Sequence, residues 1–298
     1  MQLVSKTIKQ VATGCHEYKY TARDFNRIRR LIYQRAGICL SGQKSEMVYN
    51  RLIKRLRKFG MTCFDDYLNM LEQGNDQEWD LFVGLLTTHL TSFFRESYHF
   101  PILVEHVSRQ TRKGKVLLWS CAASTGEEPY TMAIALAEHF ESPAAVPVKI
   151  LATDVDSGVL DVARTGVYPV DRITHLPDHI IRKYFLRGEG KFSGYAKVRP
   201  EIQEMICFNQ LNLLSDSWPM KEKFDAIFCR NVMIYFDRQT QEKVLSKCQR
   251  HLKPDGLFFA GHSENLHYAS ALFQPCGKTV YRPLSAPDTS LQLKEGCA

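Results

Sequence analysis

The sequence has no long apolar run. A membrane-spanning helix needs about 18 or more consecutive apolar residues, whereas the best apolar runs here, 116–119 and 257–260, have only the length of a strand. The N-terminus, MQLVSKTIKQ, contains no apolar core long enough for a signal peptide. We therefore expect a cytoplasmic protein that does not insert into a membrane.

Paired cysteines are also missing. None of the nine cysteines forms a C-x-x-C motif, so the sequence indicates neither a zinc knuckle nor a thioredoxin-type site, and we expect no metal. Cys121, Cys207 and Cys229 lie inside apolar runs. They are therefore expected to be small buried hydrophobic residues.

The chain contains no internal repeat and no low-complexity segment. Its 298 residues are 44% hydrophobic and 24% charged, which excludes general disorder and corresponds to about two domains. Residues 1–60 hold 14 Lys and Arg against 3 Asp and Glu, while the remainder is mildly acidic. This asymmetry predicts an acidic partner for the N-terminal part: nucleic acid, a membrane surface or an acidic protein.

Residues 1–20 show no clear periodicity and are expected to form a loose tail. The helical periodicity of residues 21–90 predicts a small all-helical domain. Residues 91–114 are read as a linker, and 284–298 as a second tail. Between them, 115–283 alternates short apolar strands with helices, the pattern of an α/β domain with a parallel sheet. Helices are expected near 21–36, 43–59, 64–71, 78–90, 127–140, 157–164 and 238–252; strands are expected at 116–119, 148–154, 224–229, 256–261 and 278–283, the last as an antiparallel edge.

Residues 167–203 interrupt this alternation with several Gly and Pro and two short strand-like pieces. They predict an inserted hairpin subdomain. Its turn is rich in glycine, at Gly188, Gly190 and Gly194. Glycines within strands mark bulges or places where another backbone approaches, although from sequence alone they could simply shape the turn.

The first predicted strand is followed by a turn of small residues, SCAASTG, and then by Glu127 and Glu128. A strand, a tight turn and a helix start form the nucleotide-binding element of open α/β folds. The G-x-G-x-x-G spacing of dinucleotide sites is absent. Two acids at this position favour a cationic ligand without phosphate, and S-adenosylmethionine fits that description.

Two further strand ends carry polar residues. Asp154 ends the second strand, where a carboxylate can accept hydrogen bonds from ribose hydroxyls; the alternative is a cap on the next helix. Arg230 and Asn231 end the run FDAIFC and interrupt apolar sequence. Enzymes that methylate amino nitrogens often carry an Asn/Asp-Pro-Pro-Tyr motif at this point. Here Val232 and Met233 replace the two prolines, which disfavours an amino group as the methyl acceptor.

Several segments together closely resemble the chemotaxis receptor glutamate methyltransferases, the CheR-type family. The resemblance spans about 21–283, in the order THLTSFFRE (88–96), AASTGEEPY (122–130), LATDVD (151–156), NLL (212–214), FDAIFCRNVMIYF (224–236) and LKPDGLFFAGHSEN (252–265). It implies a Rossmann-like S-adenosylmethionine-dependent methyltransferase domain of α/β class, with a small inserted antiparallel β-subdomain and an all-helical N-terminal domain. The implied activity is methylation of glutamate side chains on bacterial chemoreceptors, which releases S-adenosylhomocysteine.

The resemblance also implies site residues. Cofactor contacts would come from His89, Thr91, Arg95, Glu128, Asp154, Asn212, Leu213, Arg230 and Asn231. His89 stands where the family often has Asn, so it is either a contact or a polar helix end. Arg95 and Tyr235 would lie near the transferred methyl group. A glutamate acceptor has a pKa of about 4.3 and is already ionised, so no general base is required.

Two surfaces are assigned to the receptor. At 100° per residue, Lys44, Arg51, Lys54, Arg55 and Lys58 form a basic stripe that is expected to face outward and meet the acidic receptor helices. In the inserted subdomain, Arg187, Gly188, Gly190, Gly194 and Arg199 would dock a C-terminal receptor pentapeptide as an added strand.

Two other functions compete with this one. The basic N-terminal helices would suit an RNA-binding methyltransferase, but few aromatic residues are interleaved with the basic ones. A pure binding module with a degenerate cofactor site is disfavoured, because the acidic residues, Arg230 and Asn231 of the predicted site are all present. His262, in a His-Ser-Glu sequence, is not expected to be catalytic because no P-C-x-x-C follows it.

Overall fold

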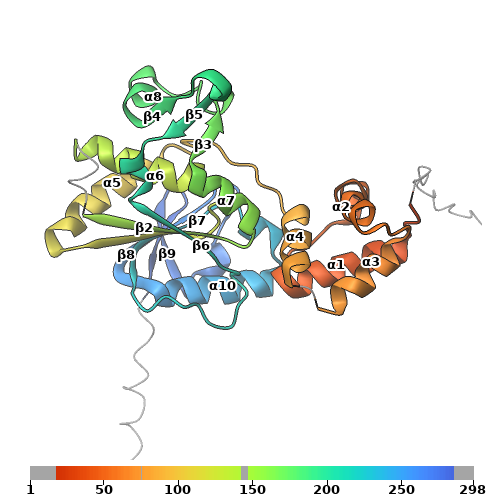
Figure 1. Ribbon diagram of the computed structural model, residues 1–298. Helices are drawn as coiled ribbons and strands as arrows, with labels where there is room; N and C mark the ends of the chain where they lie inside the picture. Colours follow the sequence, from red (N-terminus) through yellow and green to blue (C-terminus); the bar gives the residue numbers. More distant parts are fainter. Residues whose placement is uncertain (1–17, 75, 142–146, 285–298) are drawn as a thin grey trace, which may run out of the picture.

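The computed structural model describes residues 18–74, 76–141 and 147–284 (Figure 1). Nearly all of the two predicted tails, including Cys15 and Cys297, lies outside these ranges. The N-terminal helices pack around one hydrophobic cluster, and they are α1 (Ala22–Ala36), α2 (Ser45–Phe59), α3 (Phe64–Glu72) and α4 (Asp76–Leu86).

Local signals explain where these helices begin and end. Thr21 caps α1: its hydroxyl accepts from the backbone N–H of Asp24, whose carboxylate accepts from the N–H of Thr21. Gly37 and Gly60 end α1 and α2 with φ of 69° and 64°, a conformation that favours glycine. Helix α4 ends at Leu86, earlier than predicted, so 87–91 is an irregular segment.

Among the described residues, seven strands form the main sheet in the order β6-β2-β1-β7-β8-β10-β9. The strands are β1 (Val116–Ser120), β2 (Val148–Asp154), β6 (Ile206–Gln210), β7 (Phe224–Cys229), β8 (Leu252–Ala260), β9 (Phe273–Gly277) and β10 (Val280–Pro283). Strands β6, β2, β1, β7 and β8 run parallel, and β10 is antiparallel to both of its neighbours.

The expectations for the main sheet need correction. β10 is antiparallel as predicted, but β9 rather than β10 forms the edge of the sheet. β6 and β9 were not predicted at all. Cys207 is exposed rather than buried, because it lies on the edge strand β6.

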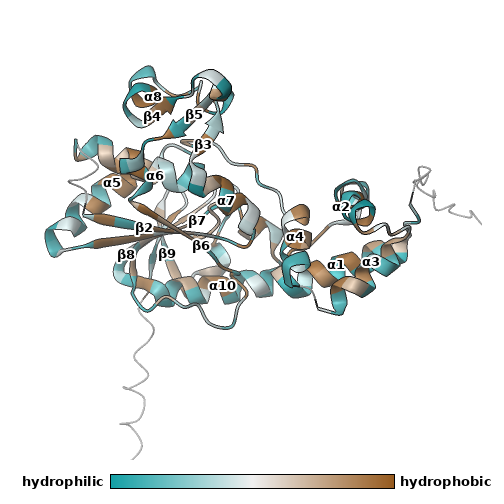
Figure 2. Cartoon of the chain, viewed as in Figure 1, coloured by the Kyte–Doolittle hydropathy of each residue, from teal (hydrophilic) through white to brown (hydrophobic). Residues whose placement is uncertain are grey.

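The sheet is covered on both faces (Figures 1 and 2). Helices α5 (His99–Gln110), α6 (Glu127–His139) and α7 (Ser157–Thr165) cover one face, and α10 (Arg238–His251) covers the other. Successive strand residues point to opposite faces: Phe228 belongs to the core under α5 and α6, while Ile227 packs toward α10. Figure 2 shows apolar residues along the central strands and polar residues on the outer sides of the helices.

The predicted insertion forms a second antiparallel sheet, which lies at the top of the molecule in Figure 1. Its strands pair in the order β3-β5-β4. Its elements are β3 (Val167–Pro169), α8 (Asp178–Tyr184), β4 (Phe185–Arg187), β5 (Tyr195–Val198) and α9 (Pro200–Gln203). β4 is therefore an edge strand.

Candidate active site

A cavity of about 370 Å³ opens at the carboxyl ends of β1, β2 and β7, beside the segment that follows α4. Crevices of this kind, outside the strand ends of an open α/β sheet, are where such folds bind ligands. The structure brings the entire predicted cofactor set into the lining of this one cavity: His89, Thr91, Arg95, Glu128, Asp154, Asn212, Leu213, Arg230 and Asn231. Tyr235 and Lys44 line it as well.

The turn after β1 forms one wall of the cavity. Ser124 has φ of 50° and Gly126 has φ of 99°, so the chain reverses sharply before α6 begins at Glu127. A Cβ atom on Gly126 would lie 2.9 Å from the Tyr168 hydroxyl oxygen and from the Ala163 Cβ, so no larger residue fits. This tight turn places Glu128 at the start of α6, facing the cavity.

Asp154 is fixed by backbone donors. Its Oδ2 accepts from the N–H of Ser124 at 2.8 Å and its Oδ1 from the N–H of Asp156 at 3.1 Å. Burial raises the pKa of Asp154, and these two hydrogen bonds only partly oppose the effect. The capping alternative for Asp154 is wrong, because Asp156 caps α7 by accepting from the Gly158 N–H at 2.8 Å.

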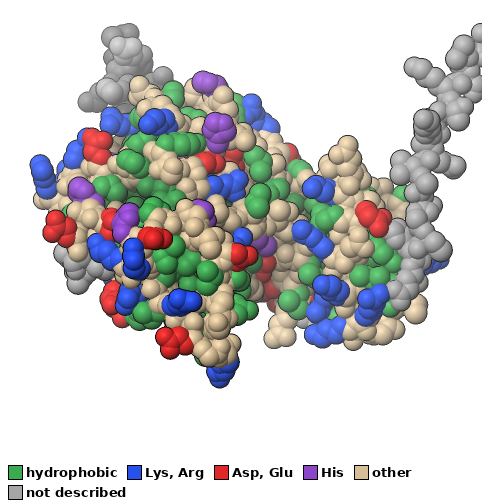
Figure 3. Space-filling model, turned by 90° about the horizontal axis from the view of Figure 1, so that it is seen from above, with side chains coloured by type: hydrophobic (Ala, Val, Ile, Leu, Met, Phe, Trp, Pro, Cys, Tyr) green, Lys and Arg blue, Asp and Glu red, His purple; other side chains and the backbone are tan. Residues whose placement is uncertain are grey.

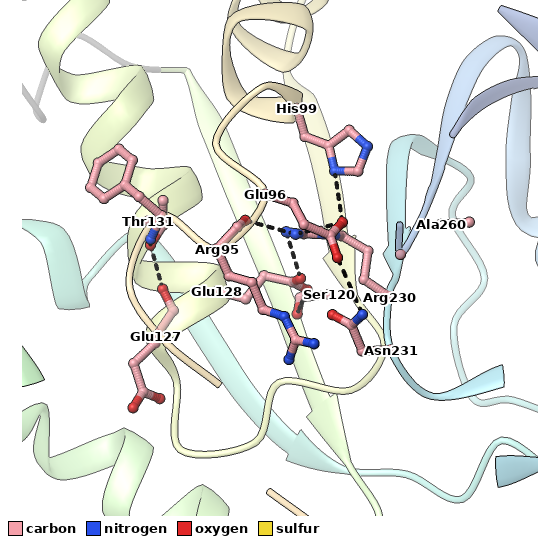
Figure 4. A network of polar contacts seen from close by, with 12 residues as sticks. Arg95, Glu96, His99, Ser120, Glu127, Glu128, Thr131, Arg230, Asn231 and Ala260 are labelled. Atoms are coloured by element: carbon pink, nitrogen blue, oxygen red, sulfur yellow. Dashed lines mark hydrogen bonds and ion pairs between the residues drawn. The ribbon is translucent and has the colours of Figure 1, made fainter. Parts of the chain in front are cut away.

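Arg230 lies in a clamp of acidic groups (Figure 4). Its Nη2 lies 3.0 Å from Glu96 Oε2, and its Nη1 lies 3.2 Å from Glu128 Oε2. Nη2 also donates to the Arg95 carbonyl oxygen at 2.7 Å. Burial raises the pKa of Glu128, and the positive charge of Arg230 acts against that rise. The guanidinium of Arg230 therefore connects the linker, at Arg95 and Glu96, to Glu128 at the start of α6.

Glu96 is a site residue that the sequence reasoning missed. Besides its ion pair with Arg230, it accepts from the Asn231 side-chain amide at 3.3 Å and from the His262 N–H at 3.0 Å. Burial would raise the pKa of Glu96, but the His262 N–H and Arg230 outweigh burial and lower it. Its signal in the sequence was its place next to Arg95 in the linker motif.

Glu264, also missed, shapes the loop after β7. Its buried carboxylate accepts from the backbone N–H groups of Gly261, Asn231 and Met233, at 2.6, 2.8 and 2.8 Å. These bonds hold Asn231 in a left-handed conformation with φ of 58°. The His262 side chain is exposed, and His262 does not line the cavity.

His89 reaches across to the catalytic sheet from the segment after α4. Its Nε2 lies 3.0 Å from Asp156 Oδ2 and 2.6 Å from the Thr87 hydroxyl oxygen. Burial would lower the pKa of His89, but the hydrogen bond to Asp156 and the charge of Asp154 outweigh burial and raise it. His89 is therefore not a helix-end residue, since α4 has already ended at Leu86.

The opposite wall joins the helical part to the sheet. The Asn212 side-chain amide donates to the Arg35 carbonyl oxygen at 2.6 Å, and Leu213 is buried beside it. Tyr235 lies in a short 3₁₀ helix at Met233–Tyr235, and its carbonyl oxygen accepts from the Cys39 N–H at 2.8 Å. Arg95 donates from Nη1 to the Leu90 carbonyl oxygen at 2.5 Å.

The basic stripe on α2 needs correction. Arg51 turns inward and donates to the carbonyl oxygens of Leu85 and Thr87, at 3.0 and 2.5 Å. Arg55 forms a bidentate ion pair with the buried Glu78, with 2.8 Å between Arg55 Nε and Glu78 Oε1. These two arginines hold α2 against α4 because a buried carboxylate and free carbonyls require donors. The stripe that remains exposed consists of Lys44, Lys54 and Lys58.

The predicted docking residues lie on the second sheet, apart from the cavity. Arg187 is exposed on the edge strand β4, and Arg199 is half-buried after β5. A Cβ atom on Gly188 would lie 2.1 Å from the Phe192 carbonyl oxygen, so this glycine is required by the turn itself. Gly190 and Gly194 have φ of 57° and 89° and face open space.

The cavity fits a cationic nucleoside. The buried Asp154 and the half-buried Glu128 supply acceptors, and the buried Ser124 hydroxyl oxygen has no hydrogen-bond partner among the described residues. Such an unsatisfied polar group normally acquires a partner from water or from a ligand. An open α/β sheet with an acidic first turn and an acid at the end of β2 defines an S-adenosylmethionine-dependent methyltransferase.

Comparison with known proteins places this chain more narrowly. Residues 23–87 match the family model "CheR methyltransferase, all-alpha domain", and residues 89–282 match "CheR methyltransferase, SAM binding domain". The chain therefore belongs to the CheR methyltransferase family, and its cofactor is S-adenosylmethionine.

Curated relatives agree over most of their length. The chemotaxis protein methyltransferase 2 of Pseudomonas aeruginosa is 47% identical over 271 residues, which cover 91% of this chain and 96% of the relative. The chemotaxis protein methyltransferase of Escherichia coli is 48% identical over 258 residues, or 86% of this chain and 89% of the relative. These comparisons give no support to the RNA-binding alternative. No helix in the described ranges is both long and apolar enough to cross a membrane.

Proposed function

We propose that this enzyme transfers the methyl group of S-adenosylmethionine to glutamate side-chain carboxylates of chemoreceptors and so forms glutamate methyl esters. The observation that carries the proposal is that the nine residues implied by the resemblance, which lie in separate segments of the sequence, all line one cavity, in a chain whose relatives are named chemotaxis protein methyltransferases.

When bound, S-adenosylmethionine supplies an electrophilic methyl group on a positively charged sulfur. The acceptor carboxylate is ionised at neutral pH, so the protein needs to align it rather than deprotonate it. Arg95 and Tyr235 line the cavity and are suited to this role: the guanidinium offers several N–H donors to a carboxylate, and the phenol offers one O–H. Arg230 cannot serve in this way because Glu96 and Glu128 already neutralise it.

Apolar side chains at the cavity support the removal of water from the acceptor. Leu90 is 74% exposed and Ile234 is 53% exposed, and both line the cavity. Large apolar residues so exposed beside a site are suited to contact a partner. A receptor helix packed on them would exclude water from the carboxylate, which strengthens its interactions with Arg95.

The exposed stripe Lys44, Lys54 and Lys58 supports a role in receptor recognition. Lys44 lines the cavity, and the other two continue the stripe along α2. Figure 3 shows Lys and Arg side chains gathered on the smaller lobe of the molecule, next to the hollow between the lobes. Positive charge beside the site would orient helices rich in glutamate and speed their encounter.

The test is methyl transfer from tritiated S-adenosylmethionine to receptor membranes and, in parallel, to total RNA. We expect label in receptor protein that mild alkali releases as methanol, the behaviour of a carboxyl methyl ester. Tyr235→Phe, which removes only the phenolic O–H, should lower receptor methylation while S-adenosylhomocysteine still binds. Base-stable label in RNA and none in receptor would reject the proposal.

Receptor recognition by the stripe needs its own variants. Lys54→Glu with Lys58→Glu should reduce receptor methylation and leave S-adenosylhomocysteine affinity unchanged. Lys115→Glu is the matched control, because this exposed lysine precedes β1 at the opposite end of the strands from the cavity. Equal methylation by the double variant and the control would remove this role.

We also propose that the second sheet tethers the enzyme to the receptor's C-terminal pentapeptide. β4 is an edge strand, so an extended peptide can pair with it as an added strand. The surface here combines the exposed Arg187 with three exposed apolar side chains, Leu186, Phe192 and Tyr195. A flexible tether of this kind gives an effective substrate concentration of about millimolar.

Arg187→Glu tests the tether better than a bulky residue at Gly188, which would disrupt the turn. We expect the variant to lose binding of the pentapeptide in calorimetry, while Arg182→Glu, an exposed arginine on α8, binds like wild type. If wild-type protein binds none of the terminal pentapeptides of its host's chemoreceptors, the tether does not exist in this enzyme.

A further inference from the structure

Three cysteines meet in the core between the main sheet and α10. Cys121 directly follows β1, Cys229 ends β7, and Cys248 lies in α10. All are free thiols and are at most 2% exposed, and their sulfur atoms lie within 4.8 Å of one another. The chain brings them together from three elements, so no short motif in the sequence reveals the cluster.

The spacing of the sulfur atoms suits three-fold coordination. An ion bonded to three thiolates at about 2.3 Å would place the sulfurs about 4 Å apart in a planar arrangement and about 3.5 Å apart in a pyramidal one, so the three cysteines would have to draw together around it. Soft thiolate ligands select soft ions. No other potential ligand group joins the trio among the described residues, which favours an ion that accepts three-fold coordination.

The cofactor cavity borders the cluster. Cys121 is among the residues that line the cavity, next to Ala122, whereas Cys248 lies behind it in α10. The residue after Cys229 is Arg230, which also lines the cavity. The cavity is therefore the nearest described space from which a small neutral molecule would approach the first thiol.

We propose that Cys121, Cys229 and Cys248 form a binding site for a soft, three-coordinate ion, and that trivalent arsenic is such an ion. Arsenous acid enters as a neutral molecule with three hydroxyl groups. Three S–H bonds and three As–OH bonds break, while three As–S bonds and three water molecules form, so the step is balanced without an oxidant or reductant. The product is uncharged, which suits a buried apolar site because burying a net charge is costly.

The test is arsenite uptake by the full-length enzyme, measured by native mass spectrometry after removal of unbound arsenite. We expect one retained arsenic atom per wild-type chain, with loss of three protons. Cys248→Ala should bind at least about tenfold more weakly, because the third thiolate binds intramolecularly. Its affinity for S-adenosylhomocysteine shows whether the variant is folded.

Cys207→Ala is the matched control, since Cys207 is exposed on β6 and lies outside the cluster. It should retain arsenic like wild type. Saturating S-adenosylhomocysteine should slow uptake by wild type because it occupies the entry route. The site is disproved if wild type retains no arsenic or if Cys248→Ala retains it as tightly as wild type; unchanged uptake with the cofactor product bound disproves the route.

Discussion

Two aspartates two residues apart illustrate how the backbone assigns roles to identical side chains. Asp154 ends β2 and has its carboxylate held toward the cavity by the N–H groups of Ser124 and Asp156. Asp156 caps α7 and pairs with His89. The first acid is therefore available to a ligand, and the second joins the segment after α4 to the catalytic sheet.

Replacing Asp154 with Ala should weaken cofactor binding by about 1–3 kcal/mol, the range for a hydrogen bond to a charged group. The reason is the loss of a fixed acceptor at the point where the ribose hydroxyls are expected. Calorimetric titration with S-adenosylhomocysteine measures the change. Asp161→Ala, at an exposed position on α7, is the control. Wild-type affinity in folded Asp154→Ala protein would contradict the assignment.

The His89–Asp156 pair should make stability depend on pH. The pKa of His89 is raised in the folded state and that of Asp156 is lowered. Protonated His89 therefore stabilises the fold fully below its unfolded pKa of about 6.5, and the contribution disappears as pH rises through the raised pKa. The stability lost in His89→Asn should be about 1 kcal/mol larger at pH 5.5 than at pH 9.

Urea unfolding at the two pH values measures this difference. His267→Asn serves as the control because His267 is exposed. A loss of stability in His89→Asn that is equal at both pH values would show that the pair contributes nothing through its charge.

At the residue scale, the position of a side chain could be predicted where it follows a recognisable strand, and it could not where the side chain acts through distant backbone. Asp154, Arg230 and Asn231 each stand at a strand end, so their place in the cavity could be inferred. Glu264 could not, because its partners are N–H groups of a loop some thirty residues earlier and of its own turn. Such a role depends on the fold and not on local sequence.

At the scale of elements, helical periodicity identified α2 but could not separate its exposed cations from its structural ones. Arg51, Arg55 and Lys58 fall on one arc by spacing alone. In the structure only Lys58 of these three is fully exposed, because α4 brings a buried carboxylate, Glu78, against α2. A helical wheel describes one helix, whereas the burial of a charge depends on its neighbour.

The Arg55–Glu78 pair should be a strong determinant of stability. Arg55→Met removes the guanidinium partner of a carboxylate that is only 3% exposed, and breaking a buried pair costs about 3–5 kcal/mol. The double variant Arg55→Met with Glu78→Leu should lose less than Arg55→Met alone, because it leaves no buried charge. Thermal and urea unfolding test both. A double variant less stable than the single one would contradict this account.

Edge strands explain what was missed in the sheet. β6 and β9 are the two edges, and most of their residues are partly or fully exposed. Their sequences lack the continuous apolar runs that identified β1 and β7, whose residues are mostly buried. Strands buried on both faces are recognisable from hydrophobicity, and edges are not.

At the scale of the whole molecule, the cavity is built from both the helical part and the sheet. Lys44 and Met47 contribute from the helical part, while Glu128 and Asp154 contribute from the sheet. The basic and acidic charges are divided in the same way, with the exposed lysine stripe on one side of the cavity and the acids inside it. In the proposed mode of recognition, the receptor would meet a positively charged surface and the cofactor would meet acidic groups.

This division predicts different salt dependences for the two ligands. Exposed charges are screened over about 8 Å at physiological ionic strength, and buried ones much less. Raising NaCl from 50 to 300 mM should therefore lower kcat/KM for receptor methylation several-fold and change S-adenosylhomocysteine affinity by less than about twofold. The Lys54→Glu and Lys58→Glu double variant should show a shallower salt dependence of methylation than wild type, because it lacks the exposed charges that salt screens. If wild type and this variant lose methylation equally with salt, the attraction between the enzyme and its receptor does not arise from α2.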